Sequence, residues 1–250
     1  MSLPDFPICS YLLTVLLYCC YTPAHEILYQ EVFLPSVPAG FEVRASVIGI
    51  EGRGDYLSDE FLQCIRAKLD LVVTSIEENL GQEIVWSDVD IRFFDVTPDG
   101  LGVQLLSADC DILFQRESPR MLDVNTGFFV CHCTQPVLDF FRTIRTELDL
   151  YPEENEQMVV NRLILPLASH SQRLRHVVQW GYLPAGFYAR THGWPPPRHL
   201  ALYHANYTKG RDAIRQKRAQ FSEIACVRHW GLPAWLWSVI RRIPGRISAP

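Results

Sequence analysis

Residues 83–94 read EIVWSDVDIRFF, an apolar run that leads into two aspartates and then into a second apolar run. Ile84, Val85 and Trp86 predict a fully buried strand, and Asp88 and Asp90 follow at its end. An ionised carboxylate in a buried position costs roughly several kcal/mol unless a cation lies against it. The pair therefore indicates a divalent metal, because hard oxygen ligands suit magnesium or manganese together with the oxygens of a substrate phosphate. Two aspartates in an ordinary turn are the alternative interpretation, since so short a motif also occurs by chance.

Strand-like and helix-like patterns alternate on both sides of this stretch. Continuous or alternating apolar runs predict strands, and apolar residues spaced three and four apart predict helices. Their alternation is typical of an α/β fold in which helices flank a sheet. The predicted strands cover residues 10–19, 41–48, 128–131 and 199–204, and the predicted helices cover residues 22–35 and 58–80 or begin at Pro136 and Pro152.

Two of the predicted helix starts have local signals. Thr22 is the expected N-cap of the first helix, which places a helix N-terminus at the end of the first strand, where a phosphate or nucleotide commonly binds. Ser58 is the expected N-cap of the second helix. On that helix Arg66 and Lys68 lie off the apolar stripe, so they are expected either on the solvated surface or against a phosphate. The stripe consists of Phe61, Ile65, Leu69, Val72, Ile76 and Leu80, and Gly81 is the expected stop.

Length, charge and cysteine usage limit the class of protein. The 250 residues suffice for one sizeable α/β domain, and a net charge of −5 argues against a general nucleic-acid binder, which would show a basic surface. The eight cysteines include no CxxC pair, and Cys131-His132-Cys133 fits a plain strand better than a metal site, because neighbouring residues of a strand point to opposite faces. Residues 8–20 lack the basic start of a signal peptide and are too short to span a bilayer. A cytoplasmic protein is therefore expected.

Six short motifs follow one another along the chain: WSDVDIRFF, ADCDILFQ, NTGFFV, EENEQMVVN, LPAGFYA and YHANYTKG. In this order they resemble the nucleotide-diphospho-sugar transferase family, metal-dependent glycosyltransferases with the GT-A fold. Each motif alone is weak, but six in order are specific, and the resemblance covers roughly residues 10–220. It implies a GT-A-like, Rossmann-related α/β fold with a mixed, mainly parallel sheet flanked by helices. The implied glycosyltransferase domain covers residues 8–222, and an aromatic and basic tail covers residues 223–250.

The resemblance also implies a metal site. Asp88 and Asp90 would bind Mn²⁺ or Mg²⁺ with the donor diphosphate, and His204 would complete the metal shell. Two carboxylates and an imidazole are a plausible manganese site on chemical grounds as well. Asp109 and Asp111 form a second DxD, which the resemblance assigns to a later strand of the family pattern.

Further residues acquire implied roles in catalysis and donor binding. Lys209 would stabilise the departing nucleotide diphosphate. Glu156 and Gln157 would hold the donor sugar near the reacting carbon, with Glu-Gln here in place of the family's usual Asp-Gln. The residues expected to contact the nucleotide sugar are Thr22, Lys68, Asp88, Asn125, Thr126, Gly127, Asn206 and Gly210, of which residues 125–127 are expected to form a turn.

The implied activity is transfer of a hexosyl or pentosyl unit from a nucleotide-diphosphate sugar to a glycan, protein or lipid acceptor, which residues 181–194 are expected to contact. Retention and inversion both stay open, because no nucleophilic carboxylate is evident. A metal-dependent nucleotidyltransferase or phosphohydrolase is the alternative if Asp109 and Asp111 meet the first DxD in space. A non-catalytic nucleotide-sugar-binding protein on the same fold is the third reading.

The end of the chain combines tryptophans with arginines over residues 229–250. This pattern predicts either a helix packed on the domain or peripheral contact with an anionic membrane. Pro233 and Pro244 limit that helix to residues 234–243, too short to cross a bilayer. Asn206 begins a formal glycosylation sequon, but we expect it to be unmodified, because a glycan there would block donor access.

Overall fold

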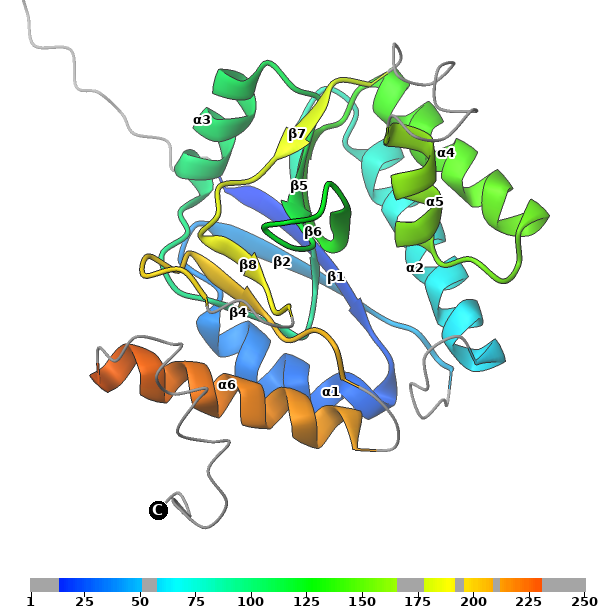
Figure 1. Ribbon diagram of the computed structural model, residues 1–250. Helices are drawn as coiled ribbons and strands as arrows, with labels where there is room; N and C mark the ends of the chain where they lie inside the picture. The colour runs from blue at the N-terminus through cyan, green and yellow to red at the C-terminus, as the bar shows by residue number, and fades with distance from the viewer. Residues whose placement is uncertain (1–13, 51–57, 166–177, 192–195, 209–211, 231–250) are drawn as a thin grey trace, which may run out of the picture.

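The computed structural model describes residues 14–50, 58–165, 178–191, 196–208 and 212–230. In this part of the chain a nine-stranded sheet has the order β2-β1-β3-β6-β5-β8-β9-β4, with β7 paired to β5 (Figure 1). Five of its eight described pairings are parallel, so the predicted mixed, mainly parallel α/β sheet is confirmed. The strands are β1 Val15–Tyr21, β2 Phe41–Val47, β3 Glu83–Asp88, β4 Ile91–Phe93, β5 Ile112–Arg116, β6 Val124–His132, β7 Trp180–Tyr182, β8 Phe187–Ala189 and β9 Leu202–His204.

Helices cover both faces of the sheet. Figure 1 shows α2, α4 and α5 grouped on one side, with α1 and α6 together on the other. One apolar core joins α2, α4 and α5 to the sheet, and a smaller one joins α1 and α6 to β8 and β9. The helical segments are η1 Pro23–His25, α1 Glu26–Leu28, η2 Tyr29–Phe33, η3 Leu34–Ser36, α2 Asp59–Glu78, α3 Pro98–Ala108, α4 Gln135–Leu150, α5 Glu156–Ile164 and α6 Ala213–Trp230.

Strand β3 lies in the middle of the sheet, between β1 and β6. Its residues Ile84, Val85 and Trp86 are at most 1% exposed, which confirms the predicted buried strand. Because β3 runs parallel to β1, Asp88 lies beside Cys20 at the carboxyl end of both strands. The two aspartates of the DVD motif therefore face the start of η1.

Helix α2 follows its sequence pattern closely. The Ser58 side chain accepts a hydrogen bond from the Phe61 amide at 3.2 Å, as an N-cap should. Past the helix end, Gly81 has a φ of +83°, a backbone conformation that glycine adopts without strain. Within the stripe Ile76 is buried. Leu80 lies beyond the last helical residue, and it is 47% exposed.

Predicted elements differ from the observed ones at three places. The first strand, predicted over residues 10–19, runs over Val15–Tyr21 in the described part, and residues 10–13 lie outside that part. The helix predicted over residues 22–35 is a succession of 3-10, α and π turns. The helix predicted to begin at Pro152 begins at Glu156, because the Asn155 side chain caps it by accepting from the Met158 amide at 2.9 Å.

Other differences concern strands and one missed helix. Residues 125–127 lie inside β6, where we predicted a turn, and the last strand is shorter than predicted. The segment predicted as one acceptor loop contributes most of β7 and all of β8, with residues 192–195 outside the description. Helix α3 was not predicted, since its sequence PDGLGVQLLSA contains two glycines, which disfavour helices.

The last described helix, α6, extends into the predicted tail. Helix α6 continues across residue 222, where the sequence predicted the end of the catalytic domain. Residues 231–250, and with them the predicted helix over residues 234–243, lie outside the described part. Within that part, every helix is too short or too polar to cross a membrane.

The burial of the α2 stripe leads to a stability prediction. Ile76→Ala is expected to lower the free energy of unfolding by about 2–5 kcal/mol, because a fully buried side chain leaves a cavity. Leu80→Ala removes the same number of carbon atoms from an exposed position, so its expected effect is about 0.5 kcal/mol or less. Urea denaturation followed by circular dichroism measures both. Equal losses would contradict the packing of α2 against the sheet.

Candidate active site

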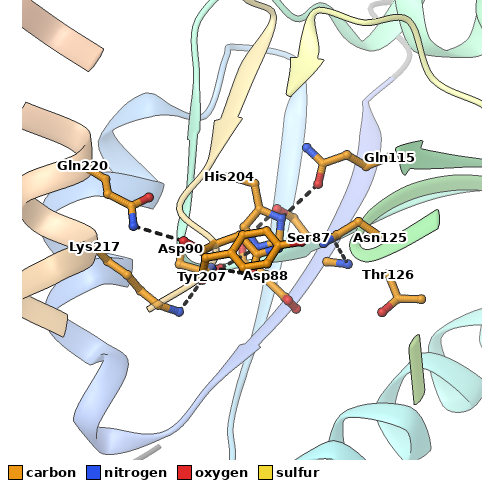
Figure 2. Close-up of polar contacts among 12 residues, drawn as sticks. Ser87, Asp88, Asp90, Gln115, Asn125, Thr126, His204, Tyr207, Lys217 and Gln220 are labelled. Carbon is orange, nitrogen blue, oxygen red and sulfur yellow. Dashed lines mark hydrogen bonds and ion pairs between the residues drawn. The ribbon is translucent and has the colours of Figure 1, made fainter. Parts of the chain in front are cut away.

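Three strand ends bring together three side chains of the kind that can hold a metal ion. Asp88 ends β3, Asp90 directly precedes β4, and β4 pairs with β9 so that Ile91 lies opposite His204. Asp88, Asp90 and His204 each offer one ligand atom, and these atoms lie within 4.8 Å of one another. Figure 2 shows the three side chains converging on one point. In the described part of the chain this is the one such group of three, so Cys131-His132-Cys133 forms none.

A second contact sets the orientation of the His204 ring. Its Nδ1 lies 2.9 Å from Oε1 of Gln115, a fully buried side chain on β5. An amide oxygen only accepts, so this contact places a proton on Nδ1, and Nε2 is turned toward Asp90. Nε2 lies 3.3 Å from Oδ1 of Asp90, so both atoms are within reach of one cation. Two carboxylates and an imidazole held in this way suit a divalent cation.

Gly127 on β6 makes room for these ligands. A Cβ atom at this position would collide with Cε1 of His204 and would lie 2.9 Å from Oδ2 of Asp88. Real Cβ atoms essentially never approach that closely. The glycine is therefore required by close packing, and its φ angle plays no part.

Lys68 is buried, although its sequence position suggested the surface or a phosphate. Its Nζ lies 2.8 Å from Oδ1 of Asp88 and 2.9 Å from Oε1 of Glu156, and its side chain is 10% exposed. Burial opposes a charge here, but the two carboxylates raise the pKa of Lys68 above its ordinary value. Thr126 donates from Oγ1 to the same Glu156 oxygen at 3.2 Å. The ammonium group thus joins α2, β3 and α5.

Asp90 has partners on both of its oxygens. His204 contacts Oδ1, and the ammonium group of Lys217 on α6 forms an ion pair with Oδ2 (Figure 2). Burial favours the protonated acid, but Lys217 and His204 hold the pKa of the Asp90 carboxyl well below its usual value. Asp90 is therefore ionised at neutral pH and able to bind a cation.

Glu117 gathers the side chains predicted to hold the donor sugar. This carboxylate is 7% exposed and follows β5 directly. It accepts hydrogen bonds from the amides of Asn125 at 2.6 Å, Gln157 at 3.3 Å and Asn206 at 3.2 Å. Gln157 in turn accepts from the Thr126 backbone amide at 3.3 Å. One buried carboxylate therefore orients Asn125 of β6, Gln157 of α5 and Asn206 after β9.

A cavity of about 160 Å³ opens beside the metal-ligating group at the end of β1. Thr22 lines it but forms no capping hydrogen bond, and its hydroxyl lies 2.9 Å from Nδ1 of His25 instead. Burial, followed by the nearby charge of Lys217, lowers the pKa of His25, so the ring is neutral. Polar and charged residues that line the cavity are Thr22, His25, Glu60, Lys68, Asp88, Asp90 and Lys217.

The structure thus assembles most of the residues that the sequence singled out. Lys209 and Gly210 lie outside the described residues. Asp109 and Asp111 lie at the amino end of β5, away from the site, and Asp111 accepts from the Gln179 amide at 2.8 Å. The site residues that sequence reasoning missed are Gln115, Glu117 and Lys217. The first two stand within ILFQRES, directly after the apolar run Ile112-Leu113-Phe114, which signals a strand.

Comparison with known proteins gives a family match over most of the chain. The model of the nucleotide-diphospho-sugar transferase family matches residues 55–220. No curated protein sequence matches the chain.

Solved structures give the fold. The chain is similar to a glycosyltransferase involved in the glycosylation of the major capsid of PBCV-1, with 12% identity and a TM-score of 0.54 over 83% of this chain and 98% of that one. It is also similar to the galactosyltransferase LgtC in complex with donor and acceptor sugar analogs, with 11% identity and a TM-score of 0.51 over 85% and 95%. GlyE of Streptococcus pneumoniae TIGR4 aligns at 10% identity and a TM-score of 0.47 over 70% of this chain, which spans 46% of that one. The predicted GT-A-like fold is confirmed.

The close packing at Gly127 leads to a second prediction. Gly127→Ala is expected to weaken Mn²⁺ binding by about 10–100-fold, because the added methyl group must displace His204 or Asp88, and disturbed ligand orientation typically has that effect. Gly49→Ala is the matched control, since a Cβ there meets nothing within 4 Å. Electron paramagnetic resonance of free Mn²⁺ measures the affinity. If both variants bind Mn²⁺ like the unmodified protein, the assignment of the ligands is wrong.

Proposed function

The chain belongs to the nucleotide-diphospho-sugar transferase family, and on this basis we propose that it is a metal-dependent glycosyltransferase. It would move a hexosyl or pentosyl unit from a nucleotide-diphosphate sugar to an acceptor. The observation that carries the metal dependence is the convergence of Asp88, Asp90 and His204 within 4.8 Å.

The metal site is proposed to hold Mn²⁺ or Mg²⁺ against the donor diphosphate. Bound there, the cation would neutralise the negative charge that develops on the leaving diphosphate. Asp88 and Asp90 would supply carboxylate oxygens, and His204 would supply Nε2 while Gln115 fixes its ring. Lys209 would add a further positive charge beside the β-phosphate.

The nucleotide is proposed to bind in the cavity at the end of β1. Ligands of open α/β sheets bind outside the carboxyl ends of the strands, and this cavity lies there. Thr22 would offer a hydroxyl to the nucleotide, Asn206 follows β9, and Gly210 is proposed as a further contact on the family resemblance. Lys68 contributes through Asp88, because its ammonium group is already held by two carboxylates.

The donor sugar is proposed to lie between β6 and α5. Residues 125–127, Glu156 and Gln157 form one hydrogen-bonded unit there. Glu117 holds the Asn125 and Gln157 amides, so their remaining polar groups have fixed directions. Such preorganisation is what orients a sugar for reaction.

The acceptor is proposed to enter beside β8. A second cavity of about 250 Å³ is lined there by Arg116, Tyr182 and Tyr188, together with the intervening turn. The Arg116 guanidinium lies 4.0 Å from the centre of the Tyr182 ring. Aromatic faces with one polar handle suit the apolar faces of sugar rings. Much of its lining comes from residues 181–194, which is why we propose this cavity for the acceptor.

Strand direction argues against the alternative enzyme class. A two-metal nucleotidyltransferase or phosphohydrolase would need Asp109 and Asp111 next to the first aspartate pair. They lie at the amino end of β5, whereas Asp88 lies at the carboxyl end of β3, which runs in the same direction. A single cation is therefore the arrangement that we propose.

Exchange of one ligand tests the proposal. Asp90→Asn is expected to lower manganese-dependent hydrolysis of a nucleotide-sugar donor by about 100-fold or more, since loss of even a supporting residue weakens a metal site by 10–100-fold. The unmodified protein is first screened against UDP- and GDP-sugars, with release of the nucleoside diphosphate as the readout. EDTA treatment is expected to abolish release, and added Mn²⁺ to restore it.

Asp109→Asn is the control, because it makes the same charge change in the remote DxD. Its donor hydrolysis is expected to stay unchanged. Full metal-dependent release by Asp90→Asn would refute the proposed metal role. Unmodified protein that binds donors but releases nothing would favour the non-catalytic reading instead.

A further inference from the structure

Lys217 occupies an unusual position on α6. The residues of this helix that pack inward are Ala213, Gln220, Phe221 and Ile224, which recur at helical spacing. Lys217 falls on the same face, and its side chain is 15% exposed. Lysine at such a position needs a reason, because it is rarely buried unless paired.

Its partner is the central metal ligand. The ammonium group of Lys217 forms an ion pair with Oδ2 of Asp90, as Figure 2 shows, and lines the same cavity as Asp88 and Asp90. Lys217 and a divalent cation therefore use the same carboxylate, and the two positive charges repel one another across it. This repulsion weakens metal binding as long as the ion pair is in place, although each cation has its own Asp90 oxygen.

The charges around Asp90 indicate when the ion pair between Lys217 and Asp90 opens. Three carboxylates, those of Asp88, Asp90 and Glu156, are ion-paired here with two ammonium groups, those of Lys68 and Lys217. These ion-paired groups carry three negative and two positive charges, and Glu60 adds a negative charge at the same cavity. A divalent cation alone brings positive charge next to Lys217, which it repels. The diphosphate of a donor brings negative charge and offers Lys217 new oxygen partners within the same cavity.

We propose that Lys217 makes the binding of metal and of nucleoside diphosphate depend on one another. This inference rests on the proposed function. Without nucleotide, Lys217 competes with the metal for Asp90. With nucleotide, it releases Asp90 to the metal and pairs with a diphosphate oxygen. Linkage requires that each ligand then tightens the binding of the other by the same factor.

Two dissociation constants for Mn²⁺ test this coupling, one without nucleotide and one with saturating UDP or GDP, whichever the unmodified protein binds. In Lys217→Met, Mn²⁺ alone is expected to bind about tenfold more tightly, and the nucleotide about tenfold more weakly, a size within the usual range of coupling. Free Mn²⁺ is measured by electron paramagnetic resonance and nucleotide binding by calorimetry. The two shifts have opposite signs, whereas simple damage to the site would weaken both.

Matched variants complete the experiment. Arg218→Met removes one positive charge from the next position on α6, where it pairs with Glu31 at the surface, and is expected to leave both affinities unchanged. Lys217→Arg retains the charge and is expected to retain the coupling. Lys217→Gln replaces Lys217→Met if that variant does not fold, with the same expected shifts.

The outcomes separate this inference from the proposed function. If the unmodified protein binds neither Mn²⁺ nor nucleotide, the proposed function fails and the coupling fails with it. If the unmodified protein binds both while Lys217→Met matches Arg218→Met, the function stands and the coupling is refuted. Weaker binding of Mn²⁺ alone in Lys217→Met also refutes it.

Discussion

The ammonium group of Lys68 lies between the carboxylates of Asp88 and Glu156, and the rest of the site depends on this pairing. It joins one long helix, the central strand and the short helix that faces β6. Loss of one member of a buried ion pair leaves an uncompensated charge, which costs about 3–5 kcal/mol. The same pairing that holds α2 and α5 in position therefore also directs Asp88 toward Asp90 and His204.

Around this ion pair, polar groups are satisfied in two different ways. Asp88, Asp90 and Glu156 are balanced by ammonium groups, so their surroundings change when a cation enters. Glu117 is held by neutral amides of Asn125, Gln157 and Asn206, which are insensitive to such a change. The carboxylates balanced by ammonium groups suit reversible binding of a metal and a diphosphate. Glu117 and its amide donors suit the fixed orientation of a sugar, because a buried acceptor with several donors is costly to rearrange.

Local features were predictable, and contacts between distant segments were not. The buried strand, the Ser58 cap and the metal chemistry of two aspartates all depend on neighbouring residues. Lys68 was expected at the solvated surface or against a phosphate, because helical spacing shows which residues leave the apolar stripe, but not what faces them. Lys217 is 127 positions from Asp90, and the neighbouring sequence on α6 does not indicate an acidic partner. The start of α5 was misplaced because Pro152 and Asn155 both signal a helix start, and the side-chain cap prevailed.

The two DxD motifs show how topology selects among equal local signals. Both motifs adjoin a buried strand, and β3 and β5 run in the same direction because each is antiparallel to β6. Asp88 ends its strand, whereas Asp111 precedes its own, and the register through Cys131 sets Ile112 level with Ile84. Asp111 is thus level with Glu83, five residues or about 16 Å from Asp88 along the sheet at 3.3 Å per residue. The carboxyl end of β5 instead delivers Gln115 and Glu117 to the site. Strand polarity therefore places Asp88 at the candidate metal site, whereas Asp111 accepts a hydrogen bond from the Gln179 backbone amide, although the two motifs have the same chemistry.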